Sequence, residues 1–398
     1  MMKKMDYGKK SEKLDMNNFT SIVILSYNTL LMTQMCIESI RSFTDEGTYE
    51  IIVIDNASTD GSAEWISKQP DIKYILNKEN KGFPKGCNQG MAIAEGSEIL
   101  LLNSDVIVTP RWLDQLKKAL YSSDKIGAVG CLTNKCSNCQ SIPVPYDQDN
   151  FSIDELIDFS NKFNRSNSSK WLPYLFLVGF CMLFKTSVYK SIGEMDEMFS
   201  PGNYEDDDYS VRIRLAGYQI LLCQDTFIHH FGSASFFKSM NKSEYVNKAK
   251  IYENILIKNK TYFLDKWHLK EDYKKIRIPV NDIAKIIKNS KRVLLVGTAD
   301  LMDIINLKRY IYGTTFEYLT NNSFDNKMIN GDITIYYNTD IIYAIKKIKY
   351  DYDYIIVTYN CSKLVEINEI ISILNKKIDP VRIIILDDIT TKRCPPLL

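Results

Sequence analysis

The sequence predicts two consecutive α/β domains, each built around a parallel or mainly parallel sheet. At 398 residues, the chain is longer than one hydrophobic core usually serves. From Ser21 to about Leu132, short β-rich apolar runs alternate with segments of helical periodicity, and the same alternation starts again near residue 291. We therefore expect a polar leader at 1–18, a first domain at 19–268, a linker with helical character at 269–290 and a small Rossmann-like domain at 291–398.

The first domain opens with a regular series of strands and helices. The expected strands are SIVIL, EIIVID, IKYIL, EILLLN and GAVGCL, and the helices between them include residues 29–43 and 111–123. Ligands of such sheets collect at the carboxyl ends of the strands. The polar residues that end these strands are therefore the first candidates for a site.

A long excursion follows at 140–170, with one short helix expected within DELIDFSNKF. Loops of this length are uncommon unless they are lids or binding loops. The apolar run Leu172–Phe184 predicts a strand pair or a strand and turn. Beyond it we expect a helix at TSVYKSIG, an acidic helix start at YEDDDYSVRIRLAGY, the strand QILLCQ and a long helix up to Trp267.

The second domain repeats the alternation. Its expected strands lie in KRVLLVGTAD, FEYLTNN, ITIYYN, YDYIIVTY and RIIILDD, with helices at LMDIINLKRYIY, DIIYAIKKIK and KLVEINEIISILNK. The stretch VLLVGTAD ends a strand in glycine but lacks the G-x-G-x-x-G spacing of a dinucleotide site. Docking of a substrate, dimer formation or contact with a partner enzyme is the role we expect here.

Composition narrows the class of protein. Lys+Arg number 50 against 49 Asp+Glu, and a net charge of +1 gives no basic footprint for nucleic acid. Nine cysteines without a signal-peptide pattern favour a reducing cytoplasm. The longest apolar run is shorter than the roughly 20 residues that span a bilayer. Cys131, Cys136 and Cys139 lack a fourth ligand at fitting distance, so zinc is not expected.

Each early strand of the first domain ends in polar side chains: Ser26, Tyr27 and Asn28; Asp55, Asn56, Ser58 and Asp60; Asn103, Ser104 and Asp105. Such residues also favour turns and helix N-caps. For Asp60, before a helix, capping and ligand contact are equally good interpretations. Asp55 ends an apolar strand, and because a buried carboxylate needs a partner, a ligand contact is the better interpretation.

Four adjacent carboxylates, Glu205 to Asp208, form a second cluster. Acids suit a helix start, and Asp208 is spaced to pair with Arg212 one turn on. Crowding also raises a carboxylate's pKa, which suits a general base. Arg212 and Arg214 are either structural or available to a leaving diphosphate.

The order of these motifs resembles glycosyltransferase family 2, which has the GT-A fold. The matching stretches are SIVILSYN, IDNASTDG, NKGFPKGCNQG, LLNSD, the run 179–199, EDDDYSVRIRLAGY and HHFGSASF. They cover about Phe19 to Trp267 and leave the second domain outside. The small residues usual in the glycine turn are replaced here by Pro84 and Cys87.

The resemblance implies a nucleotide-sugar site. Asp55 would read a uracil or thymine base, with Ser26, Asn28, Asn56, Ser58 and Asn88 nearby, and the turn around Gly82, Phe83 and Gly86 would let the backbone approach the nucleotide. Asn103 and Ser104 would meet the ribose side of the donor. Asp105 would hold a divalent cation, Mn²⁺ or Mg²⁺, together with His230, which fits better than His229. Asp206 would be the catalytic base, with Glu205 the nearest rival.

The expected activity is therefore an inverting, metal-dependent transfer of a sugar from a UDP- or dTDP-linked donor, such as UDP-GlcNAc or dTDP-rhamnose. The acceptor would be a hydroxyl of a surface glycan or of a protein such as flagellin, and the 140–170 segment would close over it. A nucleotidyltransferase is disfavoured because SYNTLLMTQ is no Gly- and Arg-rich phosphate loop. The other alternative is a catalytically inactive module that binds a sugar nucleotide or a partner.

Overall fold

The computed structural model describes residues 19–136, 140–232, 242–269, 278–311, 313–329, 333–359 and 364–387. The chain divides into two compact units, Met1–Phe263 and Leu264–Leu398. The expected leader, Cys139 and the end of the HHFGSASF motif from Ser233 lie outside the described residues.

Unit 1 is built on an eight-stranded mixed sheet of order β3-β2-β1-β4-β8-β6-β9-β7. Its strands are β1 (Thr20–Ser26), β2 (Tyr49–Asp55), β3 (Ile72–Leu76), β4 (Glu98–Asn103), β6 (Ile126–Leu132), β7 (Trp171–Tyr174), β8 (Cys181–Lys185) and β9 (Gln219–Phe227). β1 to β4 are mutually parallel, whereas β8 runs antiparallel to both β4 and β6. The sheet is thus less uniformly parallel than the alternation predicts.

The run Leu172–Phe184 forms two strands, β7 and β8, but they do not pair with each other. β7 pairs with β9 at the edge of the sheet, whereas β8 pairs with β4 and β6 and is buried in its interior. Strand apolarity predicted the strands but could not predict their partners, which are set by tertiary contacts.

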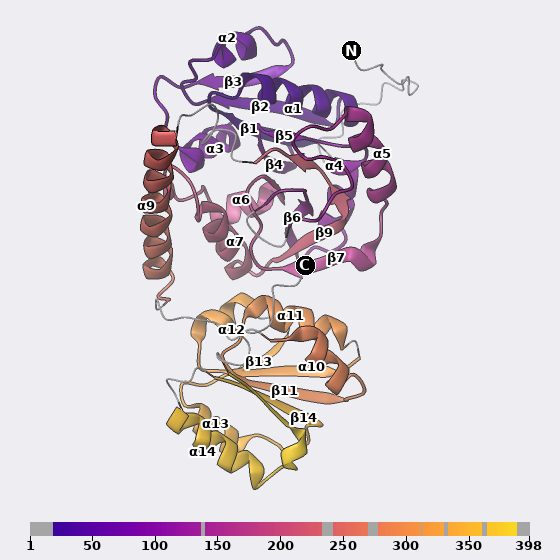
Figure 1. Cartoon of the computed structure of the whole chain (residues 1–398), viewed down its shortest axis with the longest axis vertical. Coiled ribbons are helices and arrows are strands. Elements are labelled where there is room, and N and C mark those ends of the chain that lie inside the picture. The colour runs from indigo at the N-terminus through magenta and orange to yellow at the C-terminus, as the bar shows by residue number, and fades with distance from the viewer. Residues whose placement is uncertain are drawn as a thin grey trace. The chain divides into compact units, whose positions relative to one another are not determined.

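Helices cover both faces of the sheet (Figure 1). They are α1 (Leu30–Phe43), α2 (Ser62–Ser67), α3 (Phe83–Ala92), α4 (Trp112–Leu120), α5 (Ile153–Phe163), α6 (Thr186–Ile192), α7 (Glu205–Leu215) and α9 (Lys242–Lys266). With both faces covered, the central strands lie fully inside, and Ile22, Ile24 and Leu100 have no exposed surface. None of the helices in the described part of the chain is long and apolar enough to cross a bilayer.

A short ribbon lies beside the main sheet. β5 (Val106–Ile107) pairs antiparallel with β10 (His229–His230), and His230 stands opposite Val106. The chain therefore brings a residue from the far end of unit 1 next to Asp105, which directly precedes β5.

Unit 2 holds a five-stranded sheet of order β13-β12-β11-β14-β15, in which every pair is parallel. The strands are β11 (Arg292–Gly297), β12 (Thr315–Thr320), β13 (Thr334–Tyr337), β14 (Tyr354–Tyr359) and β15 (Ile383–Asp387). The helices are α10 (Val280–Ile287), α11 (Leu301–Tyr310), α12 (Ser323–Ile329), α13 (Ile341–Lys347) and α14 (Leu364–Asn375). Figure 1 shows α11 and α12 on one face of the sheet and α13 and α14 on the other.

The segment expected to be a linker contributes to this unit. Val280, Ile283 and Ile287 of α10 are buried, and α10 packs against α11. Charged residues stand between these apolar positions in the sequence, so the segment was predicted to be a linker rather than a packed helix.

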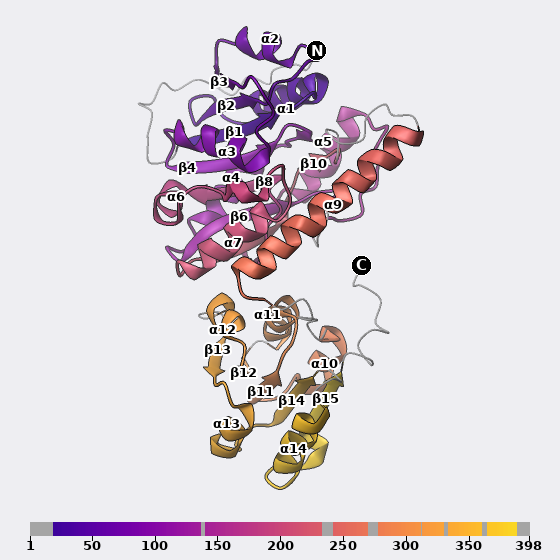
Figure 2. The same cartoon turned by 90° about the vertical axis from the view of Figure 1, so that its left-hand side faces the viewer.

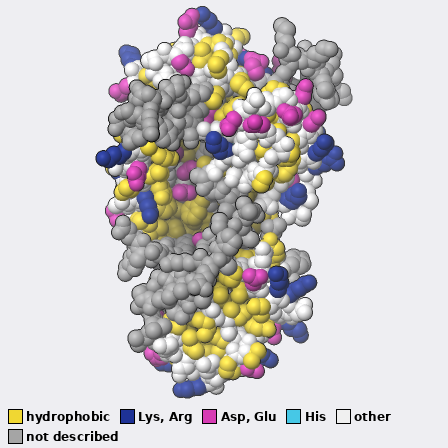
Figure 3. Space-filling model, viewed as in Figure 1, with side chains coloured by type: hydrophobic (Ala, Val, Ile, Leu, Met, Phe, Trp, Pro, Cys, Tyr) yellow, Lys and Arg dark blue, Asp and Glu magenta, His cyan; other side chains and the backbone are white. Residues whose placement is uncertain are grey.

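Among the described residues, both acidic and basic side chains are exposed on the visible face (Figure 3). This distribution agrees with the net charge of +1.

Candidate active site

The candidate site begins where three neighbouring strands end. In register, Ser26 of β1 lies beside Asp55 of β2, and Leu25 lies beside Asn103 of β4. The carboxyl ends of parallel strands meet at one edge, so the polar residues that follow them are gathered there.

Asp55 is a buried carboxylate with one oxygen still available. It is 1% exposed, and its Oδ2 accepts a hydrogen bond from the Ser58 amide at 3.0 Å. Its Oδ1 is buried and has no hydrogen-bond partner among the described residues. A buried acceptor without a donor is costly, so this atom is suited to an N–H group brought by a ligand.

Several side chains that were predicted to contact the nucleotide sugar form hydrogen bonds within the protein instead. The side chain of Asn56 donates to Asn80 and Gly82 and accepts from Asn77 and Lys81, which fixes the 77–82 turn. Asn88 is equally committed, because both ends of its amide bind Met195.

Asn28 and Ser58 join the loop that follows β1 to the loop that follows β2 by hydrogen bonds. Oδ1 of Asn28 accepts from the Thr59 amide, and the Asn28 amide donates to Oγ of Ser58 at 2.9 Å. Asp60 accepts from the Leu30 amide at the start of α1 and from Ser62, and these hydrogen bonds outweigh the effect of burial and lower its pKa. Capping is thus the interpretation that the structure favours for Asp60.

Ser26 and Ser104 belong to a buried hydroxyl cluster. Oγ of Ser26 lies 3.0 Å from Thr33, and Oγ of Ser104 lies 3.1 Å from Thr29, which in turn contacts Thr33. These hydroxyls satisfy one another beneath the site and hold the start of α1 against β4.

The glycine turn is shorter than the sequence predicted. Gly82 has φ +81° and lies against Ser200 and Pro201, where an added Cβ would approach within 3.0 Å. Gly86, however, is inside helix α3, and its added Cβ would lie 2.2 Å from Leu25 Cδ1. Gly86 therefore permits close packing of helix on strand rather than an approach to a nucleotide.

Phe83 is half-buried at the start of α3. Its ring lies near the position where a side chain on Gly179 would stand, and its Cβ lies near the corresponding position on Gly202. This places the ring beside the acidic start of α7 rather than in the apolar core.

Asp105 and His230 face each other at the end of β4. Nε2 of His230 lies 3.2 Å from Oδ1 of Asp105, and both residues are buried, at 8% and 6% exposed. Nδ1 of His230 lies 2.8 Å from the Lys135 carbonyl, which can only accept, so Nδ1 carries the hydrogen. With Nδ1–H bound to that carbonyl, Nε2 can face the carboxylate oxygen either as a protonated donor or, in the neutral imidazole, as a lone pair beside a cation.

This arrangement fits a divalent cation. Carboxylate oxygen and imidazole nitrogen both ligate Mn²⁺, and a ligating histidine commonly donates its other N–H to a backbone carbonyl. Burial opposes protonation of His230, but the Asp105 carboxylate outweighs it, so the pKa of His230 is raised. The described residues contain no group of three or more His, Cys, Asp or Glu side chains suited to a metal, so the protein offers two such ligands here.

His229 lies in a different environment. Nδ1 is 3.0 Å from the Tyr146 hydroxyl, and the ring packs against Phe151 and Phe231 at centroid distances of 4.3 and 4.8 Å. Burial, and then the charge of His230, lowers the pKa of His229 to about 4. It is therefore a neutral packing residue.

The acids at the start of α7 are held in three different ways. Both oxygens of Asp206 accept backbone hydrogen bonds at 2.9 Å, from Gly179 and Asp207. Asp208 is buried and paired with Arg212 at 3.0 Å, as its spacing predicted. Oε2 of Glu205 is buried without a partner in the described structure.

Three of these four acids lack a basic partner such as the one that Asp208 has, and burial raises their pKa: Glu205, Asp206 and Asp207. For Asp206 the two backbone hydrogen bonds oppose the effect of burial. For Glu205 and Asp207 the neighbouring Asp206 charge adds to it, and the pKa of Asp207 reaches about 8. Asp206 is thus the member best stabilised in its ionised form.

Two adjacent residues connect the acids to the Asp105–His230 pair. Gly179 donates to Asp206, while the next residue, Phe180, accepts from the Asn103 amide at 2.9 Å. The Phe180 ring also stacks on His230, with centroids 5.2 Å apart and an interplanar angle of 14°. The start of β8 therefore couples the two halves of the site.

The arginines of α7 are structural. Arg212 binds the carbonyls of Ile192 and Glu194 in addition to Asp208, and buried Arg214 donates to the Tyr174 carbonyl at 3.1 Å. Neither guanidinium is left for a diphosphate in this arrangement.

The 140–170 segment is anchored on the body of unit 1. Asn164 is fully buried, donates to Thr109, Pro110 and Phe227, and accepts from the Phe227 amide. The Tyr146 ring contacts His229, 5.8 Å between centroids. In the described state this segment supports the ribbon that carries His230.

Sequence reasoning missed Asn259 of α9, which shapes the turn before the acids. It is fully buried, and its Nδ2 donates to the carbonyls of Phe199, Gly202 and Asn203 at 2.6, 2.9 and 3.2 Å. Asn203 and Tyr204 have φ of +78° and +72°, so the turn is held in an unusual conformation. Figure 2 shows α9 along the outside of unit 1. An asparagine in a mostly polar helix gave no signal of this contact.

Comparisons with known proteins agree with the fold of unit 1. Residues 21–193 match the family model Glycosyl transferase family 2. Glycosyltransferase GlyG of Streptococcus pneumoniae is 25% identical over 215 residues, 53% of this chain and 69% of that protein. An uncharacterized glycosyltransferase of Haemophilus influenzae is 35% identical over 114 residues, 28% of this chain and only 35% of its own length.

Two solved structures are similar at lower identity. A mannosyltransferase of Pyrobaculum calidifontis in complex with GDP-Man and Mn²⁺ has a TM-score of 0.40 at 18% identity, covering 60% of this chain and 68% of that one. TarS residues 1–349 of S. aureus has a TM-score of 0.41 at 15% identity, covering 75% and 83%. The sheet topology and the match of residues 21–193 together confirm the expected GT-A type of α/β fold, and unit 1 is similar to glycosyl transferase family 2 over that range.

Proposed function

We propose that unit 1 transfers a sugar from a nucleoside-diphosphate donor to an acceptor hydroxyl, with inversion at the anomeric carbon. The observation that carries the proposal is the facing pair of Asp105 Oδ1 and His230 Nε2 at the carboxyl end of β4. The family match over residues 21–193 supports it. That match ends before Glu205 and His230, so the roles given to them depend on geometry.

The donor would lie along the strand ends. Oδ1 of Asp55 is available to accept the N–H of a uracil or thymine base, which supports a UDP- or dTDP-linked sugar of the UDP-GlcNAc or dTDP-rhamnose type. The turn at Gly82 and the ring of Phe83 would bound the donor, and Asn103 would bind ribose. Asn56, Asn88, Ser26 and Ser104 would support these groups from beneath.

Asp105 and His230 would hold Mn²⁺ or Mg²⁺, which supplies positive charge against the diphosphate of the donor. The protein orients both ligands before a donor arrives. Lys135 fixes the His230 tautomer, and Phe180 fixes the plane of its ring.

Asp206 would act as the base. It would accept the proton of the acceptor hydroxyl while that oxygen bonds to the anomeric carbon and the bond from this carbon to the diphosphate oxygen breaks. The two backbone N–H groups on Asp206 orient its carboxylate, and each oxygen keeps a lone pair. Glu205 is the weaker candidate, because burial and the Asp206 charge favour its protonated form.

The acceptor we propose is a hydroxyl of a surface glycan or of a protein such as flagellin, glycosylated in the cytoplasm. Unit 2 would then serve docking or dimer formation. No disulfide joins the cysteines of the described residues, which run from Cys36 to Cys223, and this supports a reducing compartment.

The test is a panel of nucleotide sugars with purified protein and Mn²⁺, scored by calorimetric binding and by diphosphate release. Asp105→Ala should abolish metal-dependent donor binding, whereas Asp206→Asn should retain binding and lose turnover by about 10²-fold or more. Asp124→Asn, at an exposed acid outside the site, is the matched control.

The alternative is an inactive module that binds a sugar nucleotide or a partner. Donor binding without diphosphate release by the unmodified protein, across a panel of acceptors, would favour that alternative. Absence of binding to every donor would refute the transferase and leave an inactive module that binds a partner as the remaining alternative.

A further inference from the structure

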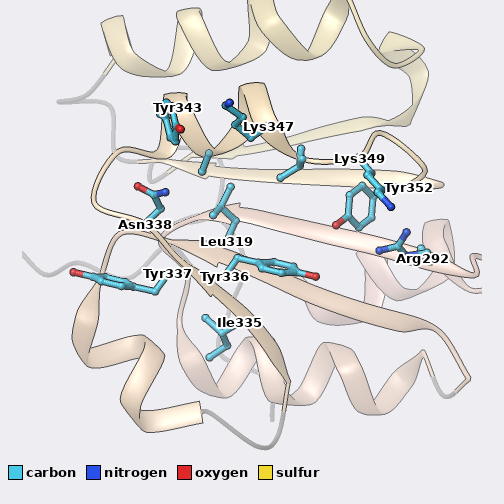
Figure 4. A pocket seen from close by; sticks show the side chains of 12 residues that line it. Arg292, Leu319, Ile335, Tyr336, Tyr337, Asn338, Tyr343, Lys347, Lys349 and Tyr352 are labelled. Atoms are coloured by element: carbon cyan, nitrogen blue, oxygen red, sulfur yellow. The ribbon is translucent and has the colours of Figure 1, made fainter.

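A groove in unit 2 lies apart from the family 2 domain. It has a cavity volume of about 520 Å³ and runs between helix α13 and the edge strand β13 (Figure 4). Leu319, Ala344 and Ile348 give it an apolar lining, and polar side chains surround this lining. The volume falls in the range of about 300–1,000 Å³ typical of small-ligand sites.

Tyrosine rings are exposed on both sides of the groove. Tyr343 projects from α13 and is 54% exposed, and Tyr336 projects from β13 and is 43% exposed (Figure 4). The Tyr336 hydroxyl donates to Glu317 at 3.1 Å, which fixes its ring. Large aromatic side chains left open beside a groove offer flat apolar faces with a polar tip.

The polar groups of the groove are positive or neutral. Lys347, Lys349, Arg292 and Asn338 line it, and none of its lining residues is acidic. Glu317 beneath the groove is buried and paired with Arg292 at 3.0 Å, and Asp351 is also paired with Arg292. Within the described residues, Lys347 and Lys349 have no ion-pair partner, and Nζ of Lys347 lies 5.5 Å from the centroid of the Tyr343 ring.

The groove is not the position of a dinucleotide. In a sheet of this order such ligands sit at the carboxyl ends of the two strands flanking the switch point, here β11 and β14. At that point an added Cβ on Gly297 would meet the Thr358 carbonyl at 2.0 Å, so the glycine serves strand packing. The groove lies instead beside β13, at the edge of the sheet.

We propose that this groove binds an acidic oligosaccharide. Sugar rings present C–H faces to aromatic side chains, and their hydroxyl groups both donate and accept, which suits Asn338 and the lysines. A carboxylate or phosphate on the sugar would complement Lys347 and Lys349. The inference is independent of the reaction of unit 1.

The probe is tetragalacturonate, titrated calorimetrically into the full chain, with maltotetraose as the neutral saccharide of equal length. We expect saturable binding of tetragalacturonate that weakens about tenfold between about 0.05 and 0.5 M NaCl, and weaker binding of maltotetraose. Tyr343→Ala and Lys347→Ala should each weaken it at least about fivefold. Both side chains are exposed, so the fold should be retained, which near-UV circular dichroism checks.

The matched controls are Lys346→Ala, one position earlier on α13 and paired with Glu369, and Tyr310→Ala on α11. Neither should change the affinity more than about twofold. Absence of tetragalacturonate binding, or equal weakening of binding by the control variants, would overturn the proposal. A concentration-dependent dimer that Tyr336→Ala abolishes would also overturn it, since the groove would then be a contact between copies of the chain. A failure here leaves donor turnover by unit 1 unaffected, so the two proposals are tested separately.

Discussion

The amide of Gly179 donates a hydrogen bond to Oδ2 of Asp206 at 2.9 Å, and the next residue, Phe180, stacks on His230. One short segment thus orients a carboxylate and an imidazole that are 24 residues apart in the chain. The Asp206 carboxylate accepts hydrogen bonds from two backbone N–H groups, and these oppose the rise in its pKa caused by burial. No such hydrogen bonds oppose the rise for Asp207, so the two neighbouring acids differ in how readily each ionises.

Asp207→Asn should stabilise the protein increasingly as the pH rises. Burial and the charges of Asp206 and Asp208 raise the pKa of Asp207 from 3.8 to about 8. At this side chain the folded state therefore binds more protons than the unfolded state between about pH 4 and pH 8, so the contribution of Asp207 to stability falls as the pH rises across this window. The asparagine variant lacks that loss.

The measurement is Tm in EDTA at pH 5 and pH 8. The gain from Asp207→Asn should be larger at pH 8, by at least about 2 °C. Asp149→Asn, at an exposed acid, is the control. An equal gain at both pH values would show that Asp207 is ionised throughout and that its environment is not the one described.

Variants of His229 and His230 should have different effects, one on protein stability and the other on metal binding. His230→Ala removes a side chain that faces Asp105 at 3.2 Å, so the Kd for Mn²⁺ should rise about tenfold or more. His229→Phe keeps the ring contacts with Phe151 and Phe231 and loses only the bond to Tyr146, so Mn²⁺ affinity should stay within about twofold and stability should fall by about 1 kcal/mol.

Calorimetry with Mn²⁺ in the presence of a nucleoside diphosphate and urea unfolding measure the two effects. Loss of metal binding in His229→Phe with retention in His230→Ala would reverse the assignment.

Strand apolarity and order were sufficient to predict the α/β alternation and the polar strand ends, because buried parallel strands impose a local pattern. Asn56 and Asn88 show where such reasoning stopped. An asparagine at a strand end can meet a ligand or the protein itself, and only the folded chain shows that these two bind the backbone of other loops. The β5–β10 pairing that brings His230 to Asp105 involves two residues on each side, too few to leave a pattern.

Asn259→Ala should destabilise unit 1 and impair turnover more than donor binding. The change leaves three backbone carbonyls at Phe199, Gly202 and Asn203 without their donor, which should cost about 2–3 kcal/mol. The same turn leads into Glu205 and Asp206, so kcat should fall while the Kd for the donor stays within about threefold.

Urea unfolding followed by tryptophan fluorescence reports mainly on unit 1, because Trp65, Trp112 and Trp171 lie there. Asn254→Ala, exposed on the same helix, is the control and should change stability by less than about 0.5 kcal/mol. Unchanged kcat in a folded Asn259→Ala protein would mean that α9 does not position the acids.

Gly86→Ala tests whether the second glycine of the NKGFPKGCNQG stretch serves packing or the nucleotide. Its added methyl group would lie 2.2 Å from Leu25 Cδ1, so the free energy of unfolding should fall by about 1–3 kcal/mol. Leu25→Ala should restore part of this loss in the double variant, because it removes the clashing atom, and the two changes should therefore be non-additive. Lys85→Ala, one residue earlier on α3, is the control and should change stability by less than about 1 kcal/mol.

The affinity of a folded Gly86→Ala protein for the nucleotide-sugar donor should stay within about threefold. If affinity were lost while stability was kept, Gly86 would have to lie against the donor rather than against Leu25.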